Sequence, residues 1–330
     1  MQAARNDDAE AIGRALRAGV DPNTKDGETG RTLAIEAARH GAVNALALLL
    51  AATEGAEEQR TESSVTARGG DGGWFVHAQK WESPLWQYSD DGWSPLMHAV
   101  SCGQLACARM LVEAGADVYL TDYDGVDAVR LAVATPGAQL TREMLTLLIE
   151  RGGFVAGGAD DDTGEHALLH AARNANAAAC DVLLRAGTGP AKLNKPNKDG
   201  ESALLLASRA GGADAVRTML AFAVERRDVV QCKLLTEHKT GDNAIHAAVR
   251  ARAVDCVREL VRPLLDVRAP EDAAELRRIL AASLARPNRK ERQTPRELAE
   301  AMAAEGGPDA ERARQAAAAL AQAEASAQNL

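Results

Sequence analysis

Aromatic residues are scarce in this chain of 330 residues, at 3% of the total. Alanine is abundant instead, which favours a thin core of helices packed on helices over a large globular centre. The longest apolar run, residues 45–52, is far shorter than the roughly 20 residues that a membrane-spanning helix needs. Residues 1–8 also lack the apolar segment of a secretory signal peptide. We therefore expect a cytoplasmic protein without membrane insertion, with association to the cytoskeleton as an open alternative.

Basic residues are in the minority, because 38 Lys and Arg stand against 47 Asp and Glu, for a formal charge of −9. Nucleic acids and anionic membranes both reward net positive charge, so this balance argues against a general affinity for either. The cysteines are odd in number and lack paired spacing, which favours small buried thiols in a reducing compartment. They are Cys102, Cys107, Cys180, Cys232 and Cys256.

Motifs of the common catalytic sites are also missing. The sequence has no Gly-Lys-Ser/Thr phosphate loop, no His-Glu-x-x-His motif, no Cys-x-x-Cys pair and no Gly-x-Ser-x-Gly elbow. His98 and Cys102 stand four residues apart, a spacing that a Cys–His nucleophile or half a zinc site would use. The repeat pattern places no third ligand or orienting carboxylate beside them, so a structural role is the stronger interpretation. We expect no enzymatic activity, no cofactor and no metal.

A recurring column of alanines is the clearest positive signal in the chain. Each alanine follows five residues after a helix-capping position, and six of the seven capping residues can accept a hydrogen bond from a first helical turn. A glycine that suits a tight turn stands two residues before six of the caps. The caps are Thr32, Ser94, Asp127, His166, Ser202, Asn243 and Thr294, and the alanines are Ala37, Ala99, Ala132, Ala171, Ala207, Ala248 and Ala299. The spacing predicts a unit of turn, short helix, turn and second helix that repeats every 33 residues where nothing is inserted, as from Ser94 to Asp127.

The repeated segments resemble the ankyrin-repeat family. Ser94–Ala99 and Thr294–Ala299 are similar to its Thr-Pro-Leu-His-x-Ala box, and Leu111–Val118 is similar to the end of its second helix. The histidine of the box stands in register at His246 and falls one place later at His98 and His170. The resemblance implies an all-α solenoid of about eight helix-turn-helix units, with a long aromatic loop insertion after the second unit and an extra helix before a C-terminal cap.

Domain boundaries follow from this register. Residues 1–52 hold repeats 1 and 2, the first of them incomplete, and residues 53–90 form the loop insertion. Residues 91–265 hold repeats 3–7, residues 266–293 an extra helix from Pro270 to Ala285 with a basic linker, and residues 294–330 the C-terminal capping repeat. Loops as long as this insertion are usually functional or disordered.

Arginine recurs seven residues after four of the caps, at Arg39, Arg173, Arg209 and Arg250, and Arg5 matches them in the opening unit. In ankyrin proteins this position lies on the inner face of the first helices. An arginine fork binds carboxylate or phosphate through two hydrogen bonds, so the stripe would suit an acidic or phosphorylated protein partner. The alternative is that these arginines serve solubility alone.

Aromatic side chains gather in and after the insertion. We expect one contiguous surface on the finger-loop side, where the loops between units project, because units three and four are adjacent and the insertion leaves from that side. The family resemblance implies that partners usually meet these loops. Its residues are Trp81, Trp86, Tyr88, Trp93, Tyr119 and Tyr123. The alternative is that these rings form a small core of the insertion itself, since large rings seek burial.

The sequence therefore predicts a non-enzymatic protein–protein interaction scaffold that binds a partner through its concave finger-loop face. Neither nucleic acid nor membrane is expected among its partners. The alternative is a structural component or adaptor of a larger permanent assembly, such as a cytoskeletal or ciliary complex or a ubiquitin ligase.

Overall fold

The computed structural model describes residues 1–52, 87–151, 164–186, 195–225, 240–265 and 274–328. These residues are all-helical and contain no β-strand, although Thr121 and Asp127 form an isolated antiparallel bridge within a loop. The chain forms two compact units, Met1–Phe154 and Val155–Leu330. Most of the insertion, including Trp81 and Trp86, lies outside the described residues, as does Cys232.

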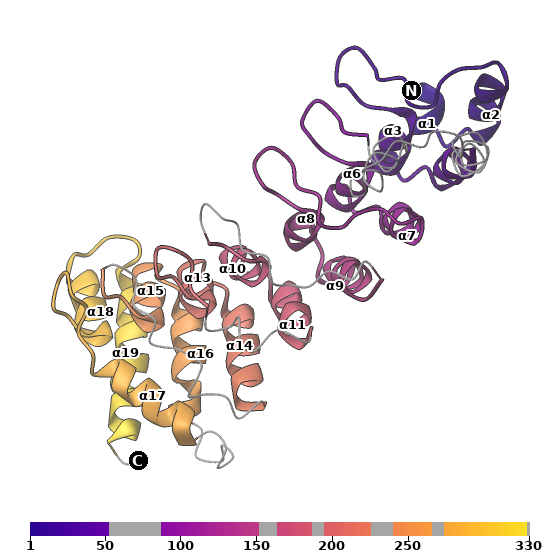
Figure 1. Ribbon diagram of the computed structural model, residues 1–330. Helices are drawn as coiled ribbons and strands as arrows, with labels where there is room; N and C mark the ends of the chain where they lie inside the picture. Colours follow the sequence, from indigo (N-terminus) through magenta and orange to yellow (C-terminus); the bar gives the residue numbers. More distant parts are fainter. Residues whose placement is uncertain (53–86, 152–163, 187–194, 226–239, 266–273, 329–330) are drawn as a thin grey trace, which may run out of the picture. The chain divides into compact units, whose positions relative to one another are not determined.

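The first unit contains four short first helices that pack on one another in chain order, α1 on α3, α3 on α6 and α6 on α8 (Figure 1). Each is followed by a second helix. The elements are α1 (Gln2–Arg5), α2 (Ala9–Arg17), α3 (Leu33–His40), a helix over residues 43–52, α6 (Pro95–Ser101), α7 (Leu105–Glu113), α8 (Ala128–Ala134) and α9 (Ala138–Thr146), which continues as the π-helical turn η2 (Leu147–Arg151). The loops that precede α3 and α8 project to the same side of this unit (Figure 1).

The second unit repeats the arrangement, and its second helices are longer from α14 onward. Its first helices pack in the order α10, α13, α15, α18, and its second helices in the order α11, α14, α16, α19. The elements are α10 (Ala167–Arg173), α11 (Ala177–Arg185), α13 (Ala203–Arg209), α14 (Ala213–Glu225), α15 (Ala244–Arg250), α16 (Val254–Leu265), α17 (Ala274–Leu284), α18 (Pro295–Ala304) and α19 (Ala310–Ala327). The extra helix α17 packs against α16 and α19 (Figure 1).

Caps and alanines occupy the places that the repeat pattern predicts. Six of the seven capping side chains accept a backbone N–H from the first helical turn, as when Ser94 accepts from Met97 at 3.3 Å. His166 is the exception, and its Nε2 donates instead to the backbone oxygen of Lys195 at 3.1 Å. All seven alanines of the column have 0% exposure. Because no larger side chain separates them, adjacent first helices approach closely and hold a constant register.

Two of the turn glycines also lie where the following loop comes close. Gly92 has φ +77°, and a Cβ added there would lie 3.1 Å from the ring of Tyr123 in the next loop. At Gly241, with φ +79°, a Cβ would lie 2.5 Å from the backbone nitrogen of Arg289. The glycines therefore permit both a left-handed backbone and a close approach of the following loop. In the last loop Arg292 takes the corresponding conformation, with φ 57°.

The helix α17 lies within the range expected for the extra helix, and most of its large apolar side chains are buried. Leu276, Leu280 and Leu284 are buried, whereas Ile279 is only half-buried. Ser283, three residues after Leu280, is buried in its place and donates to the backbone oxygen of Ile279 at 2.8 Å.

Three of the cysteines, Cys107, Cys180 and Cys256, are buried free thiols, whereas the expectation of burial is wrong for Cys102, which is exposed. Burial raises the pKa of Cys107 and of Cys256 to about 11, and that of Cys180 to about 12. These three thiols stay protonated near neutral pH and are poor nucleophiles. Within the described ranges, no helix combines the length and the apolar character that crossing a bilayer requires.

The alanine column gives a direct test of helix packing. Ala207→Leu should lower the free energy of unfolding by about 1–3 kcal/mol, because the added side chain has no room between first helices. Ala210→Leu, at an exposed position just after the same helix, should change it by less than about 0.5 kcal/mol. Urea unfolding followed by circular dichroism measures both. A neutral or stabilising leucine at position 207 would show that the alanines do not lie at a close interface.

Candidate functional site

Trp93 lies in the loop of the first unit that leads into α6, directly before the N-cap Ser94. Its Nε1 donates to Asp122 Oδ2 of the following loop at 2.9 Å. Its ring packs at a tilt of 53° against the ring of His98, with 5.3 Å between centroids. Both contacts hold the half-buried indole in one place, and the bond to Asp122 ties two adjacent loops together.

The ring of Tyr123 lies over the turn at Gly92, one residue before Trp93, so the structure brings Trp93 and Tyr123 together. Tyr123 is 82% exposed and Tyr119 50% exposed. Tyr88 is half-buried, and its pKa is raised by burial and by the charge of Asp117. Asp117 also accepts the backbone N–H of Tyr119 at 2.9 Å. Of these three tyrosines, Tyr119 and Tyr123 are the exposed ones.

His98 is a structural residue of this site. It is 4% exposed, and its Nε2 lies 3.2 Å from Ser89 Oγ. Burial, together with the charges of Arg31 and Arg39, lowers its pKa to about 4, so the ring is neutral near pH 7. In the part of the chain that the structure describes, no group of three or more His, Cys, Asp and Glu side chains could hold a metal ion.

The arginines of the second unit are paired with carboxylates that the sequence reasoning did not single out. We call Glu165, Arg173, Glu201 and Arg209 the first ion-pair cluster. Arg173 binds Glu165 and lies 3.7 Å from Glu201, which also pairs with Arg209. Asn197 Nδ2 donates to Glu201 Oε2 at 3.0 Å.

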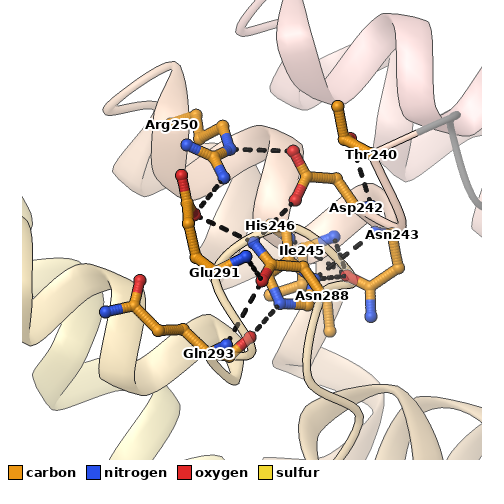
Figure 2. Close-up of polar contacts among 9 residues, drawn as sticks. All are labelled: Thr240, Asp242, Asn243, Ile245, His246, Arg250, Asn288, Glu291 and Gln293. Atoms are coloured by element: carbon orange, nitrogen blue, oxygen red, sulfur yellow. Dashed lines mark hydrogen bonds and ion pairs between the residues drawn. The ribbon is translucent and has the colours of Figure 1, made fainter.

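Asp242, Arg250 and Glu291 form the second ion-pair cluster, drawn in Figure 2. Arg250 Nε donates to Asp242 Oδ2 at 2.8 Å, and its Nη2 pairs with Glu291. Asn288 Nδ2 donates to both carboxylates, at 3.1 Å to Asp242 and 3.0 Å to Glu291 (Figure 2). The three arginines of the two clusters keep 47%, 45% and 36% of their side chains exposed, in chain order.

His246 links α15 to the next loop beneath the second cluster. It is fully buried, and its Nε2 donates to the backbone oxygen of Gln293 at 2.9 Å, while Nδ1 accepts the backbone N–H of Asn243 at 3.4 Å (Figure 2). The one histidine in register with the ankyrin box thus forms a bond between repeats.

Each arginine of the two ion-pair clusters has its own carboxylate eight residues earlier, one residue before the cap: Glu165, Glu201 and Asp242. A search of the sequence for an acid and an arginine at this spacing would have found all three pairs. Arg5, in the first unit, binds a different acid, Glu36 Oε2, at 2.6 Å. Arg39 forms no ion pair with any residue that the structure describes.

Glu36 has 0% side-chain exposure and is surrounded by positive groups. Besides Arg5, Arg31 Nη1 lies 3.5 Å from Oε1 and His40 Nε2 lies 3.4 Å from Oε2. Burial acts to raise the pKa of Glu36, but the hydrogen bond from Arg5 and the charges of Arg5, Arg31 and His40 outweigh it. The pKa therefore lies below its ordinary value, and the carboxylate is charged.

Comparison with known proteins agrees with this geometry. Residues 1–122 match the family model of ankyrin repeats in three copies. The chain is similar to the ankyrin repeat domain of Bcl-3, a member of the IkappaB protein family, at 21% identity and a TM-score of 0.54, over 78% of this chain and 96% of that one. It is also similar to the human ASB11 ankyrin repeat domain, at 17% identity and a TM-score of 0.53, over 85% of this chain and 95% of that one. A search of curated protein sequences finds no match.

The chain therefore carries ankyrin repeats over residues 1–122, and its described helices have the ankyrin-repeat fold. Ankyrin repeats generally mediate protein–protein interactions, and the fold is typically non-enzymatic.

Glu36→Gln tests the charge cluster around this residue. The variant should be about 1.5–3 kcal/mol less stable at pH 7, because hydrogen bonds to charged groups contribute about that much. Since the folded-state pKa lies below the ordinary 4.5, the stabilisation is complete above pH 4.5 and is lost as the pH falls through the lowered value. Urea unfolding at several pH values should show the difference from wild type shrinking as the pH falls below about 4.5.

The control for this series is Glu10→Gln, which removes an exposed i,i+4 pair with Arg14. It should change stability by less than about 1 kcal/mol at every pH. A stability difference for Glu36→Gln that stays constant from neutral to acid pH would contradict the proposed charge of Glu36.

Proposed function

We propose that this chain is a non-enzymatic scaffold that binds a protein partner through the finger-loop face of its first unit. The observation that carries the proposal is the exposure of Tyr123 and Tyr119, at 82% and 50%, beside an indole that Asp122 and His98 hold in place. Large rings that are exposed on a fixed framework lose little conformational freedom on binding, and aromatic residues dominate the binding energy of protein interfaces.

The paired arginines of the second unit are weaker candidates for the contact. A partner that bound Arg173, Arg209 or Arg250 would have to displace the carboxylate already paired with that arginine, or share the arginine with it. These carboxylates are Glu165, Glu201 and Asp242, in the same order. Removing one partner from a partly buried ion pair is costly, which reduces the net gain of such a contact. Binding of an acidic or phosphorylated partner along this stripe stays a prediction, as does binding by Trp81, Trp86 and Tyr88.

We place the protein in the cytoplasm, also as a proposal. Four of its cysteines are free thiols in the part of the chain that the structure describes, which suits a reducing compartment. A partner in the same compartment is then the natural ligand.

Truncation of the aromatic rings tests the proposal. Partners captured from a lysate by the wild-type chain are identified, purified singly and titrated by calorimetry. Trp93→Ala and Tyr123→Ala should each weaken binding by about 2 kcal/mol or more, because they remove anchors at the centre of the contact. Tyr123→Ala should leave the melting temperature nearly unchanged, since the ring is 82% exposed.

Arg109→Ala is the matched control, because Arg109 is also an exposed residue of the first unit but lies on the second helix α7, away from the loops. It should bind the purified partner like wild type. If both aromatic variants bind normally while their melting temperatures fall, the rings serve the fold and the partner contacts another surface.

A further inference from the structure

The first unit departs from the second at the two repeat positions that form the ion pairs. One residue before the cap, the second unit has the carboxylates Glu165, Glu201 and Asp242, whereas the first unit has Arg31, Trp93 and Val126. Seven residues after the cap, the second unit has Arg173, Arg209 and Arg250, whereas the first unit has Arg39, Ser101 and Ala134. Arg39 therefore belongs to the arginine stripe, but the position eight residues before it holds Arg31 and not a carboxylate.

The nearby carboxylates do not replace the missing one. Glu36 is fully buried and already has Arg5 at 2.6 Å, with His40 and Arg31 beyond it at 3.4 and 3.5 Å. Asp91 stands three residues before the cap Ser94, as Glu291 stands before Thr294, yet it forms no ion pair with Arg39. The guanidinium of Arg31 is also incompletely satisfied, because its buried Nε forms no hydrogen bond. Among the described residues, the positive charge of Arg39, in the last turn of α3, is therefore left without an ion-pair partner.

This charge lies beside the aromatic contact. The charges of Arg31 and Arg39 both act on His98, and His98 packs on Trp93 at 5.3 Å between ring centroids. In the second unit the equivalent arginine, Arg173, lies 3.7 Å from Glu201, the residue before the next cap. The residue before the next cap after Arg39 is Trp93, so a ring occupies the place of that carboxylate.

We propose that Arg39 binds a carboxylate side chain of the same protein partner that docks on Trp93 and Tyr123. The partner's Asp or Glu would complete the ion pair that Glu165 completes for Arg173 in the second unit. An arginine fork and a carboxylate form paired, charge-assisted hydrogen bonds, which fix the orientation of a docked segment. The inference rests on the proposed function and adds to it the chemistry of the partner.

The charges at the loop tips further restrict which partner sequences can bind. Asp90, Asp91 and Asp124 are exposed there, so a run of acidic residues crossing the tips would be repelled. Asp122 is already engaged by Trp93 and by the backbone N–H groups of Asp124 and Val126, at 3.0 and 2.8 Å. The fitting segment therefore carries a single Asp or Glu that reaches inward to Arg39, next to an apolar side chain that covers Tyr123.

A display library of random 12-residue peptides, selected on the immobilised full chain, provides a defined probe. Enriched peptides are synthesised and titrated by fluorescence anisotropy against wild type and variants. We expect an Asp or Glu at a fixed position beside an apolar residue, and at least tenfold weaker binding to Arg39→Gln. Changing the peptide acid to its amide should weaken binding to wild type by a similar factor and should have little further effect on Arg39→Gln.

Arg173→Gln is the matched control, since Arg173 occupies the same repeat position but pairs with Glu165. It should lower the melting temperature and leave peptide affinity within about twofold. Peptides without a conserved acid, or equal binding to wild type and Arg39→Gln, would overturn the role of Arg39. If those peptides still lose binding to Trp93→Ala and Tyr123→Ala, the proposed function stands alone. Failure to enrich any peptide, or peptides insensitive to both aromatic variants, would overturn the proposed function together with the inference.

Discussion

Close contact between neighbouring first helices at the alanine column is the constraint on which the rest of the structure depends. All seven alanines are fully buried, and within each unit every first helix packs against the next. The turn glycines then let the following loop approach, as Tyr123 does at Gly92 and Arg289 at Gly241. With the backbone held in this way, the residue before a cap and the residue seven after it form an ion pair in three repeats of the second unit.

The chemistry at these two positions decides what each unit presents to its surroundings. In three repeats of the second unit it is an acid and an arginine, and the ion-pair clusters pair these charges within the protein, with Asn197 and Asn288 as additional donors. In the first unit the same positions include Arg31, Arg39 and Trp93, and we propose that Arg39 and Trp93 contact another molecule. The same backbone geometry thus carries charges that are paired within the protein in the second unit and the proposed binding surface in the first.

The sequence predicted the local elements well, because caps, turn glycines and alanines act through contacts within or between successive units. Six of the seven predicted caps bond to a first helical turn, and all seven alanines are fully buried. Reasoning from helix periodicity missed the acid–arginine pairs, because the acid lies before the cap and therefore outside the helix that carries the arginine. The loop before the helix brings the acid to the arginine eight residues later. Cys102 was expected to be buried, but it takes the C-cap position of α6, where the side chain is exposed. The division of the chain into two compact units at Phe154 could not be predicted, because the repeat pattern does not change there in a way that marks it.

A double-mutant cycle in the first unit tests the central claim most directly, because it needs no partner. Arg31→Glu supplies the carboxylate that the repeat geometry places eight residues before Arg39. The free energy of unfolding is measured for Arg31→Glu, for Arg39→Gln, for the double variant and for wild type. We expect a favourable coupling of about 0.5–3 kcal/mol between the introduced acid and Arg39, comparable with that of Glu165 and Arg173 measured in the same way. A coupling of zero would show that the repeat register does not bring these two positions together, and would contradict the assignment of Arg39 as an arginine left open for a partner.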